Sequence, residues 1–225
     1  SNRLDLNDSG NNTFIGKEAG IANTTGNNNV ASGHQSLFNN TTGGRNVAYG
    51  LQSLYNNIGG GYNTASGYQS LFNNTTGSKN VALGLQSLLK NIGGNNNTAL
   101  GFESLSNNIE GQGNIASGFR SLYENTTGDN NVASGYNAGT NTIGGVNQTG
   151  SNSIFIGKDT RANADGETNQ IVIGASAVGK GSNTVTLGND SITDTYLKGV
   201  VQTSGDLTVT GDVSVTGLNI TNTTK

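Results

Sequence analysis

The residues able to do acid–base or metal chemistry are few in this chain of 225 residues, and they are spread out. There is one histidine, His34, and no cysteine, while 14 carboxylates stand without the spacing of a calcium-binding loop. Transition-metal sites are built mainly from His and Cys, so we expect no metal site and no cofactor. Asp159, Asp165 and Glu167 form one local gathering of acids, and a solvated loop explains them more simply than a cation site.

Catalytic motifs are equally hard to find. A glycosidase needs two carboxylates that face one cleft, and nothing in the sequence marks such a pair. The glycine-rich turns lack the Gly-Lys-Ser/Thr ending of a phosphate-binding loop. His34 fills a position that holds large side chains in the repeats described below, so we interpret it as a replacement for one of them. We therefore predict that the chain is not an enzyme.

The composition points to many short strands joined by tight turns. The chain has 36 Gly and 37 Asn, and both residue types tolerate the positive φ that such turns need. Val, Ile, Thr and aromatic residues between the turns favour strands, which predicts an all-β fold. The net charge is −3, with Lys and Arg scattered singly, so we expect no nucleic-acid partner. The sequence has no apolar run near the roughly 18 residues of a membrane helix, so we expect no membrane insertion in this fragment.

The elements that must position any site are set by a repeat of 17 residues. Eight glycines follow one another at that step: Gly16, Gly33, Gly50, Gly67, Gly84, Gly101, Gly118 and Gly135. Seven of them are preceded by a β-branched residue and an alanine, as in Val47-Ala48, and six are followed by Ser-Leu, as in Ser53-Leu54. An exact period of this length predicts stacked turns of a parallel β-solenoid, with two short strands and two turns per repeat. Asn residues at the same corner of each turn are expected to form ladders.

The alanine column has two explanations. Seven alanines in register indicate that something approaches that face closely. It is either the opposite wall of a narrow two-walled roll or a second chain near a trimer axis. The sequence alone leaves both open.

The regular period ends after Gly135, which suggests three segments. The spacing of the repeat glycines becomes 22, 17 and 14 residues up to Gly188. Residues 206–217 then repeat every six residues, LTVTGDVSVTG with a leading Asp, as one apolar strand that has no partner of its own. Such a strand needs copies from other chains, and a homotrimer is the simplest closed arrangement. We predict a regular head over residues 1–139, variable-spacing repeats over 140–188, and a connector with a narrow β-stalk over 189–225.

These motifs resemble a known family. Ser153-Ile-Phe-Ile-Gly157, Gln170-Ile-Val-Ile-Gly174 and Asn183-Thr-Val-Thr-Leu-Gly188 look like the repeats of YadA-like heads of trimeric autotransporter adhesins. The 17-residue units and the hexad end look like trimeric phage tail fibres. The resemblance implies a homotrimer of left-handed parallel β-rolls on a narrower stalk, placed outside the cell on a bacterial surface or on a phage virion. It also implies attachment to a glycan or protein on a host, prey or neighbouring cell.

The function that we predict is therefore a trimeric surface adhesin or receptor-recognition fibre without catalysis. The alternatives are a monomeric ice-binding solenoid, a polysaccharide-depolymerising tailspike, and a spacer without ligand. Large residues follow the repeat leucine, and this column either packs inside or forms a stripe of stacking platforms for sugars. Tyr55 and Tyr123 keep a polar tip in this column and are the candidate ligand contacts.

Overall fold

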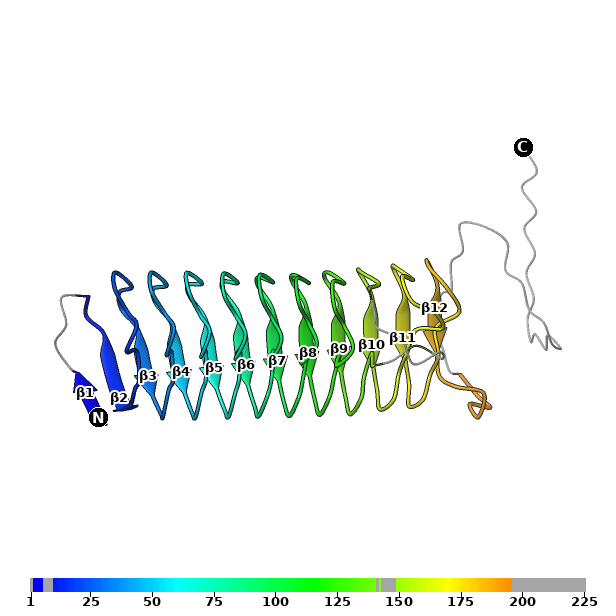
Figure 1. Ribbon diagram of the computed structural model, residues 1–225. Coiled ribbons are helices and arrows are strands. Elements are labelled where there is room, and N and C mark those ends of the chain that lie inside the picture. Colours follow the sequence, from blue (N-terminus) through cyan, green and yellow to red (C-terminus); the bar gives the residue numbers. More distant parts are fainter. Residues whose placement is uncertain (1, 6–9, 141, 143–148, 196–225) are drawn as a thin grey trace. The chain divides into compact units, whose positions relative to one another are not determined.

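The computed structural model describes residues 2–5, 10–140, 142 and 149–195, which form a coil of stacked turns (Figure 1). Each turn adds one short strand to a single sheet of 12 strands, arranged in the order of the sequence. The strands are β1 (Asn2–Asp5), β2 (Thr13–Lys17), β3 (Val30–Ser32), β4 (Val47–Tyr49), β5 (Thr64–Ser66), β6 (Val81–Leu83), β7 (Thr98–Leu100), β8 (Ile115–Ser117), β9 (Val132–Ser134), β10 (Ile154–Ile156), β11 (Ile171–Ile173) and β12 (Val185–Leu187).

The register of the sheet follows the sequence period. Strands β2 to β12 are parallel, and each repeat residue pairs with its equivalent on the next turn, as Ala48 does with Ala65. The predicted all-β parallel solenoid with 17-residue turns is thus confirmed. Strand β1 pairs with β2 in the antiparallel direction, with Leu4 opposite Ile15. This strand covers the first edge of the sheet, which would otherwise present unpaired backbone groups.

The core is a narrow file between two walls of the same chain. The repeat alanines and leucines are fully buried within a single chain: Ala31, Ala48, Ala65, Ala82, Ala99, Ala116 and Ala133 on the sheet, and Leu37, Leu54, Leu71, Leu88, Leu105 and Leu122 opposite. The first explanation of the alanine column is therefore confirmed. The second, close packing of the alanines against a sister chain, is wrong because no alanine surface is left to contact one.

The expected second strand of each repeat is not a regular strand. In the turn after β4, Gln52 and Leu54 have φ of 57° and 51°, in the left-handed region, and their equivalents in the other turns are alike. Two left-handed residues bend the chain too sharply for a pleated strand. The neighbouring turns are still joined there, since Leu54 N–H donates to Ser70 O over 3.0 Å and Asn56 N–H donates to Phe72 O over 2.9 Å.

Two files of buried asparagines hold the turns in register, as the sequence predicted for its Asn-rich corners. In the first file, Asn29 Oδ1 accepts the backbone N–H of Asn46 over 2.9 Å, and Asn46 Nδ2 donates to Gly60 O over 2.9 Å. In the second, Asn57 Nδ2 donates to Asn40 Oδ1 over 2.6 Å and to Gly60 O over 2.9 Å. Because a buried polar group without a partner is costly, these bonds let a core with few apolar residues remain closed.

In the first turn, the large core residue lies on the sheet, whereas in the following turns it lies on the opposite wall. Phe14 stands on the sheet where the following turns have alanine, and Gly20 stands opposite where they have leucine. A methyl group on Gly20 would lie 2.6 Å from the Phe14 ring, so the benzyl group fills the space of the missing leucine. Near the other end, Gly139 makes room in the same way, since a methyl group there would lie 2.9 Å from Phe155. The altered end repeats thus keep the core volume.

The stack continues past the regular period. Strand β9 pairs with β10 across the 22-residue step, so the predicted segments 1–139 and 140–188 contribute to one sheet. Contacts group residues 1–192 as one compact unit and residues 193–225 as a second. The predicted β-stalk at 206–217 lies outside the described residues. No helix long and apolar enough to cross a membrane occurs in the described part of the chain.

Candidate functional site

The outward face of the sheet carries a long apolar surface. It is formed by the side chains immediately before and after each repeat glycine, which point away from the core. The large exposed ones, here called the apolar stripe, are Ile15, Tyr49, Leu51, Tyr68, Leu83, Leu85, Leu100, Phe102, Phe119, Tyr136, Ile156, Ile173 and Leu187. These residues occupy turn after turn of the sheet, so they form a continuous surface. Contiguous exposed apolar surface of this kind marks an interaction site.

Aromatic rings are stacked within the apolar stripe. The rings of Phe102 and Phe119 lie 5.1 Å apart between centroids, and those of Phe119 and Tyr136 lie 4.9 Å apart. The Arg120 guanidinium lies 5.4 Å from the Phe119 centroid, and the Lys158 ammonium lies 5.9 Å from that of Tyr136. The 17-residue period holds these rings nearly parallel, because equivalent residues follow one another along the stack.

A groove of about 740 Å³ runs along another side of the coil. We call it the amide groove, and its lining residues are Ala22, Asn39, Thr41, Asn56, Ile58, Asn73, Thr75, Lys90, Ile92 and Ile109. Asn39 Nδ2 donates to Asn56 Oδ1 over 2.9 Å, and Asn56 Nδ2 donates to Asn73 Oδ1 over 3.2 Å. Each amide in this file keeps further hydrogen-bonding capacity, while the isoleucines offer apolar contact. The groove can therefore receive a ligand with both hydroxyl groups and apolar surface.

Tyr55 and Tyr123 lie beside these features, and the structure does not bring the two together. Tyr55 is half-buried and stacked between Phe38 and Phe72, at centroid distances of 4.9 and 5.0 Å. It precedes Asn56, which lines the amide groove. Tyr123 is half-buried four turns further along, with the Arg120 guanidinium 5.0 Å from its ring centroid. Their contact with a ligand stays a prediction.

A column of polar side chains, separate from the apolar stripe and the amide groove, forms hydrogen bonds between neighbouring turns. Gln35 Nε2 donates to Glu18 Oε2 over 2.8 Å, and Gln52 Nε2 donates to Gln35 Oε1 over 3.0 Å. The hydrogen bond from Gln35 lowers the pKa of Glu18. His34 is exposed, with its Nε2 4.0 Å from the Glu18 carboxylate. These contacts join neighbouring turns on the surface. His34 directly follows a repeat glycine, so it occupies a large-residue column of the apolar stripe, as expected.

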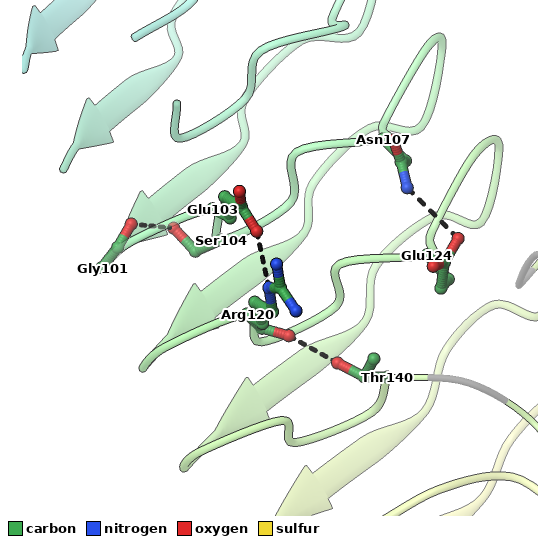
Figure 2. Close-up of polar contacts among 7 residues, drawn as sticks. All are labelled: Gly101, Glu103, Ser104, Asn107, Arg120, Glu124 and Thr140. Carbon is green, nitrogen blue, oxygen red and sulfur yellow. Dashed lines mark hydrogen bonds and ion pairs between the residues drawn. The ribbon is translucent and has the colours of Figure 1, made fainter. Parts of the chain in front are cut away.

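Further along the same column, two side chains form the ion pair drawn in Figure 2. Glu103 and Arg120 point toward each other from neighbouring turns, with 2.5 Å between Glu103 Oε2 and Arg120 Nε. The Glu103 carboxylate raises the pKa of the Arg120 guanidinium. On an adjacent side, Asn107 Nδ2 donates to Glu124 Oε2 over 3.2 Å. The pairs link successive turns, which is a structural role.

The acids of the loop before β11 accept hydrogen bonds from the preceding turn and from within the loop. Asp165 Oδ1 accepts hydrogen bonds from the Thr149 backbone and hydroxyl, and Glu167 Oε2 accepts from Gln170 Nε2 over 2.9 Å. Asp159 Oδ1 accepts from Asn137 over 3.0 Å, in a different place. Among the residues that the structure describes, no three His, Asp or Glu side chains are grouped closely enough to hold a metal ion.

Comparison with known proteins adds nothing to this description: no protein-family profile, curated protein or solved structure matches the chain significantly.

Proposed function

We propose that the chain is the head of a trimeric, non-enzymatic surface fibre that attaches to a glycan or protein of another cell. In this proposal three left-handed rolls stand side by side on a narrow stalk. The fibre lies outside the cell, on a bacterial surface or a phage virion.

The apolar stripe is the observation that carries the proposal. It has a member in every turn from β4 to β12. Two further copies in parallel register would bring each turn against its own equivalents, so every aromatic or leucine would meet another. The strand predicted for residues 206–217 would need the same parallel partners, because a single strand is not stable in water.

Trimerisation has a functional consequence. A lone solenoid presents one amide groove, whereas a trimer presents three at fixed positions. Several weak contacts to one surface then act together, and the gain in avidity reaches about 100-fold or more. A rigid rod with repeated grooves suits attachment.

The test combines assembly with attachment. Wild-type protein and the double variant Leu85→Gln/Phe102→Gln are compared by sedimentation equilibrium and by binding of labelled protein to a panel of intact bacterial and animal cells. Ile192→Gln makes the same chemical change at an exposed position outside the apolar stripe and the amide groove, and it serves as the control. We expect wild type and control to sediment as trimers and to attach to at least one cell type. The double variant should sediment as a monomer and lose attachment. Wild-type protein that is monomeric, or that attaches to no cell, contradicts the proposal.

A further inference from the structure

A second depression lies at the corner of the coil beside the amide groove. It has a volume of about 410 Å³, and we call it the corner hollow. Its lining residues are Asn27, Thr42, Gly44, Arg45, Gly59, Gly61, Tyr62, Ser78 and Lys79. Gly44 and Gly61 occupy a column where the other regular turns carry a side chain, such as Ser78 or Asn95. The hollow therefore exists because two successive turns have no side chain at this column.

The same two glycines leave a backbone donor without an acceptor. In four other pairs of this column, the side chain of one turn accepts the N–H of the equivalent residue on the turn before. Ser78 Oγ accepts Gly61 N–H over 3.1 Å, and Asn95 Oδ1 accepts Ser78 N–H over 2.8 Å. Gly44 N–H would need a side chain at position 61, and among the described residues it has no acceptor. A ligand oxygen in the hollow can take that place.

Two cations and an aromatic ring border the hollow on consecutive turns. Arg45, Tyr62 and Lys79 are equivalent residues, each one turn apart, and all three are exposed. The Arg45 guanidinium lies 5.0 Å from the Tyr62 ring centroid and donates a hydrogen bond to the Tyr62 hydroxyl. Neighbouring turns of a parallel sheet are ~4.8 Å apart, so Arg45 and Lys79 stand on either side of one space above Tyr62. Both can reach an anion held there.

The charge around the hollow favours an anion as well. Residues 19–102 contain no Asp or Glu, and their charged side chains are Arg45, Lys79 and Lys90. This half of the solenoid is thus positive, although the whole chain has a net charge of −3. Arg45 and Lys79 have no carboxylate among the residues that line the hollow, so their charges are available to a ligand.

We propose that the corner hollow binds the sulfate or carboxylate group of an acidic polysaccharide. This inference rests on the proposed attachment function and names the class of ligand. Thr41 lines the amide groove and its chain neighbour Thr42 lines the hollow, so the two depressions adjoin at these threonines. A sugar chain that spans both depressions can place its acidic group on Gly44 N–H, Arg45 and Lys79. Its hydroxyl groups then meet the asparagine file, with Lys90 as a further cation. A small free anion would use only the first of these contacts.

The test is titration calorimetry of the intact protein with dextran sulfate oligosaccharide, with neutral dextran of the same length and sodium sulfate as the other ligands. Gly61→Ser is the most informative variant, because it fills the hollow and supplies Gly44 N–H with the acceptor that Ser78 gives to Gly61. Arg45→Gln and Lys79→Gln remove one charge each. Lys180→Gln removes one charge at an exposed position elsewhere and is the control. Thermal melting of every variant checks that the fold is retained.

We expect dextran sulfate to bind and neutral dextran not to bind. Each of the three variants at the hollow should weaken affinity about tenfold or more, as for the loss of a hydrogen bond to a charged group, while Lys180→Gln leaves affinity unchanged. Affinity should also fall with added salt. Equal binding by wild type and Gly61→Ser, no binding of dextran sulfate, or equally tight binding of sodium sulfate alone would each overturn the inference. Trimeric protein that attaches to cells regardless of Gly61→Ser also overturns it, but leaves the proposed function intact.

Discussion

The exchange of core volume between Phe14 and Gly20 gives a sharp quantitative prediction. Every turn from the second to the seventh pairs an alanine on the sheet with a leucine on the opposite wall, and the first turn pairs phenylalanine with glycine. The double variant Phe14→Ala/Gly20→Leu therefore converts the first turn to the pattern of its neighbours. Gly20 has φ of 56° and the equivalent Leu37 has φ of 53°, so leucine already occupies this backbone conformation one turn away.

The single substitutions should both be harmful, for opposite reasons. Phe14→Ala removes a fully buried ring that no other group replaces, which costs about 3–5 kcal/mol. Gly20→Leu forces a side chain to within 2.6 Å of that ring, and overpacking of this kind costs about 1–3 kcal/mol. The left-handed backbone adds about 1–2 kcal/mol for a residue other than glycine. The double variant keeps that backbone cost but removes both the cavity and the clash, so its stability should lie only about 1–2 kcal/mol below wild type.

The assay is urea unfolding of the four proteins at one fixed protein concentration, followed by circular dichroism. Fixed concentration matters because assembly would shift the apparent stability. We expect the double variant to be more stable than Phe14→Ala alone, with a coupling free energy of about 4–8 kcal/mol, the sum of the cavity and clash terms. Additive effects of the two substitutions would refute the reasoning, since they would mean that Phe14 and Gly20 do not share one space.

Three further predictions concern an asparagine ladder, a repeat glycine and an ion pair. Asn57→Asp replaces a buried amide that donates to Asn40 Oδ1 and Gly60 O with a group that only accepts when ionised, so the pKa of the introduced carboxyl should be raised in the folded state. The stability of the Asn57→Asp variant relative to wild type should be highest below a pH of about 3.9, the unfolded pKa of Asp, and should fall as the pH rises above it. A difference in melting temperature from wild type that does not change with pH would contradict this. Gly67→Ala places a methyl group 2.5 Å from Gly84 O in a backbone with φ of 141°. The variant should therefore unfold at a much lower urea concentration than wild type. An unchanged urea midpoint would argue against such close stacking of the turns. Glu103→Gln breaks the half-exposed ion pair with Arg120, and calorimetric melting should show a change below about 1 kcal/mol, with a larger loss counting against our view of this pair as a surface contact.

Much of the fold follows from the spacing of the repeats. Residues one period apart are neighbours in a stack, so the burial of Ala48 and Leu54 and the ladder through Asn57 could all be predicted. The left-handed conformation of Leu54 could not, because a leucine column in register gives the same period whether the backbone is a strand or a corner. The sequence does carry a signal for the Phe14–Gly20 exchange, namely two departures from the repeat within one turn.

The candidate sites were harder to predict, and the reason is the same period. Arg45 and Lys79 look isolated in the sequence, but a separation of two periods places them on either side of one turn. Gly44 and Gly61 look like ordinary turn glycines until the equivalent residues of other turns are seen to accept backbone hydrogen bonds. The period does not say which columns point outward, so neither the apolar stripe nor the position of Tyr55 followed from it.

Parallel packing of sister chains through the apolar stripe is best tested by cysteine crosslinking, since the natural chain has no cysteine. Ser66→Cys and Ser117→Cys lie three turns apart on the stripe face, and Thr42→Cys lies at the exposed far corner. Disulfides form only when two Cα atoms come within about 7 Å. We expect mild oxidation to crosslink Ser66→Cys chains and Ser117→Cys chains each to their own kind, and to leave Thr42→Cys unlinked. Crosslinking at Thr42→Cys alone, or hybrids between co-expressed Ser66→Cys and Ser117→Cys chains, would contradict parallel, in-register assembly through this face.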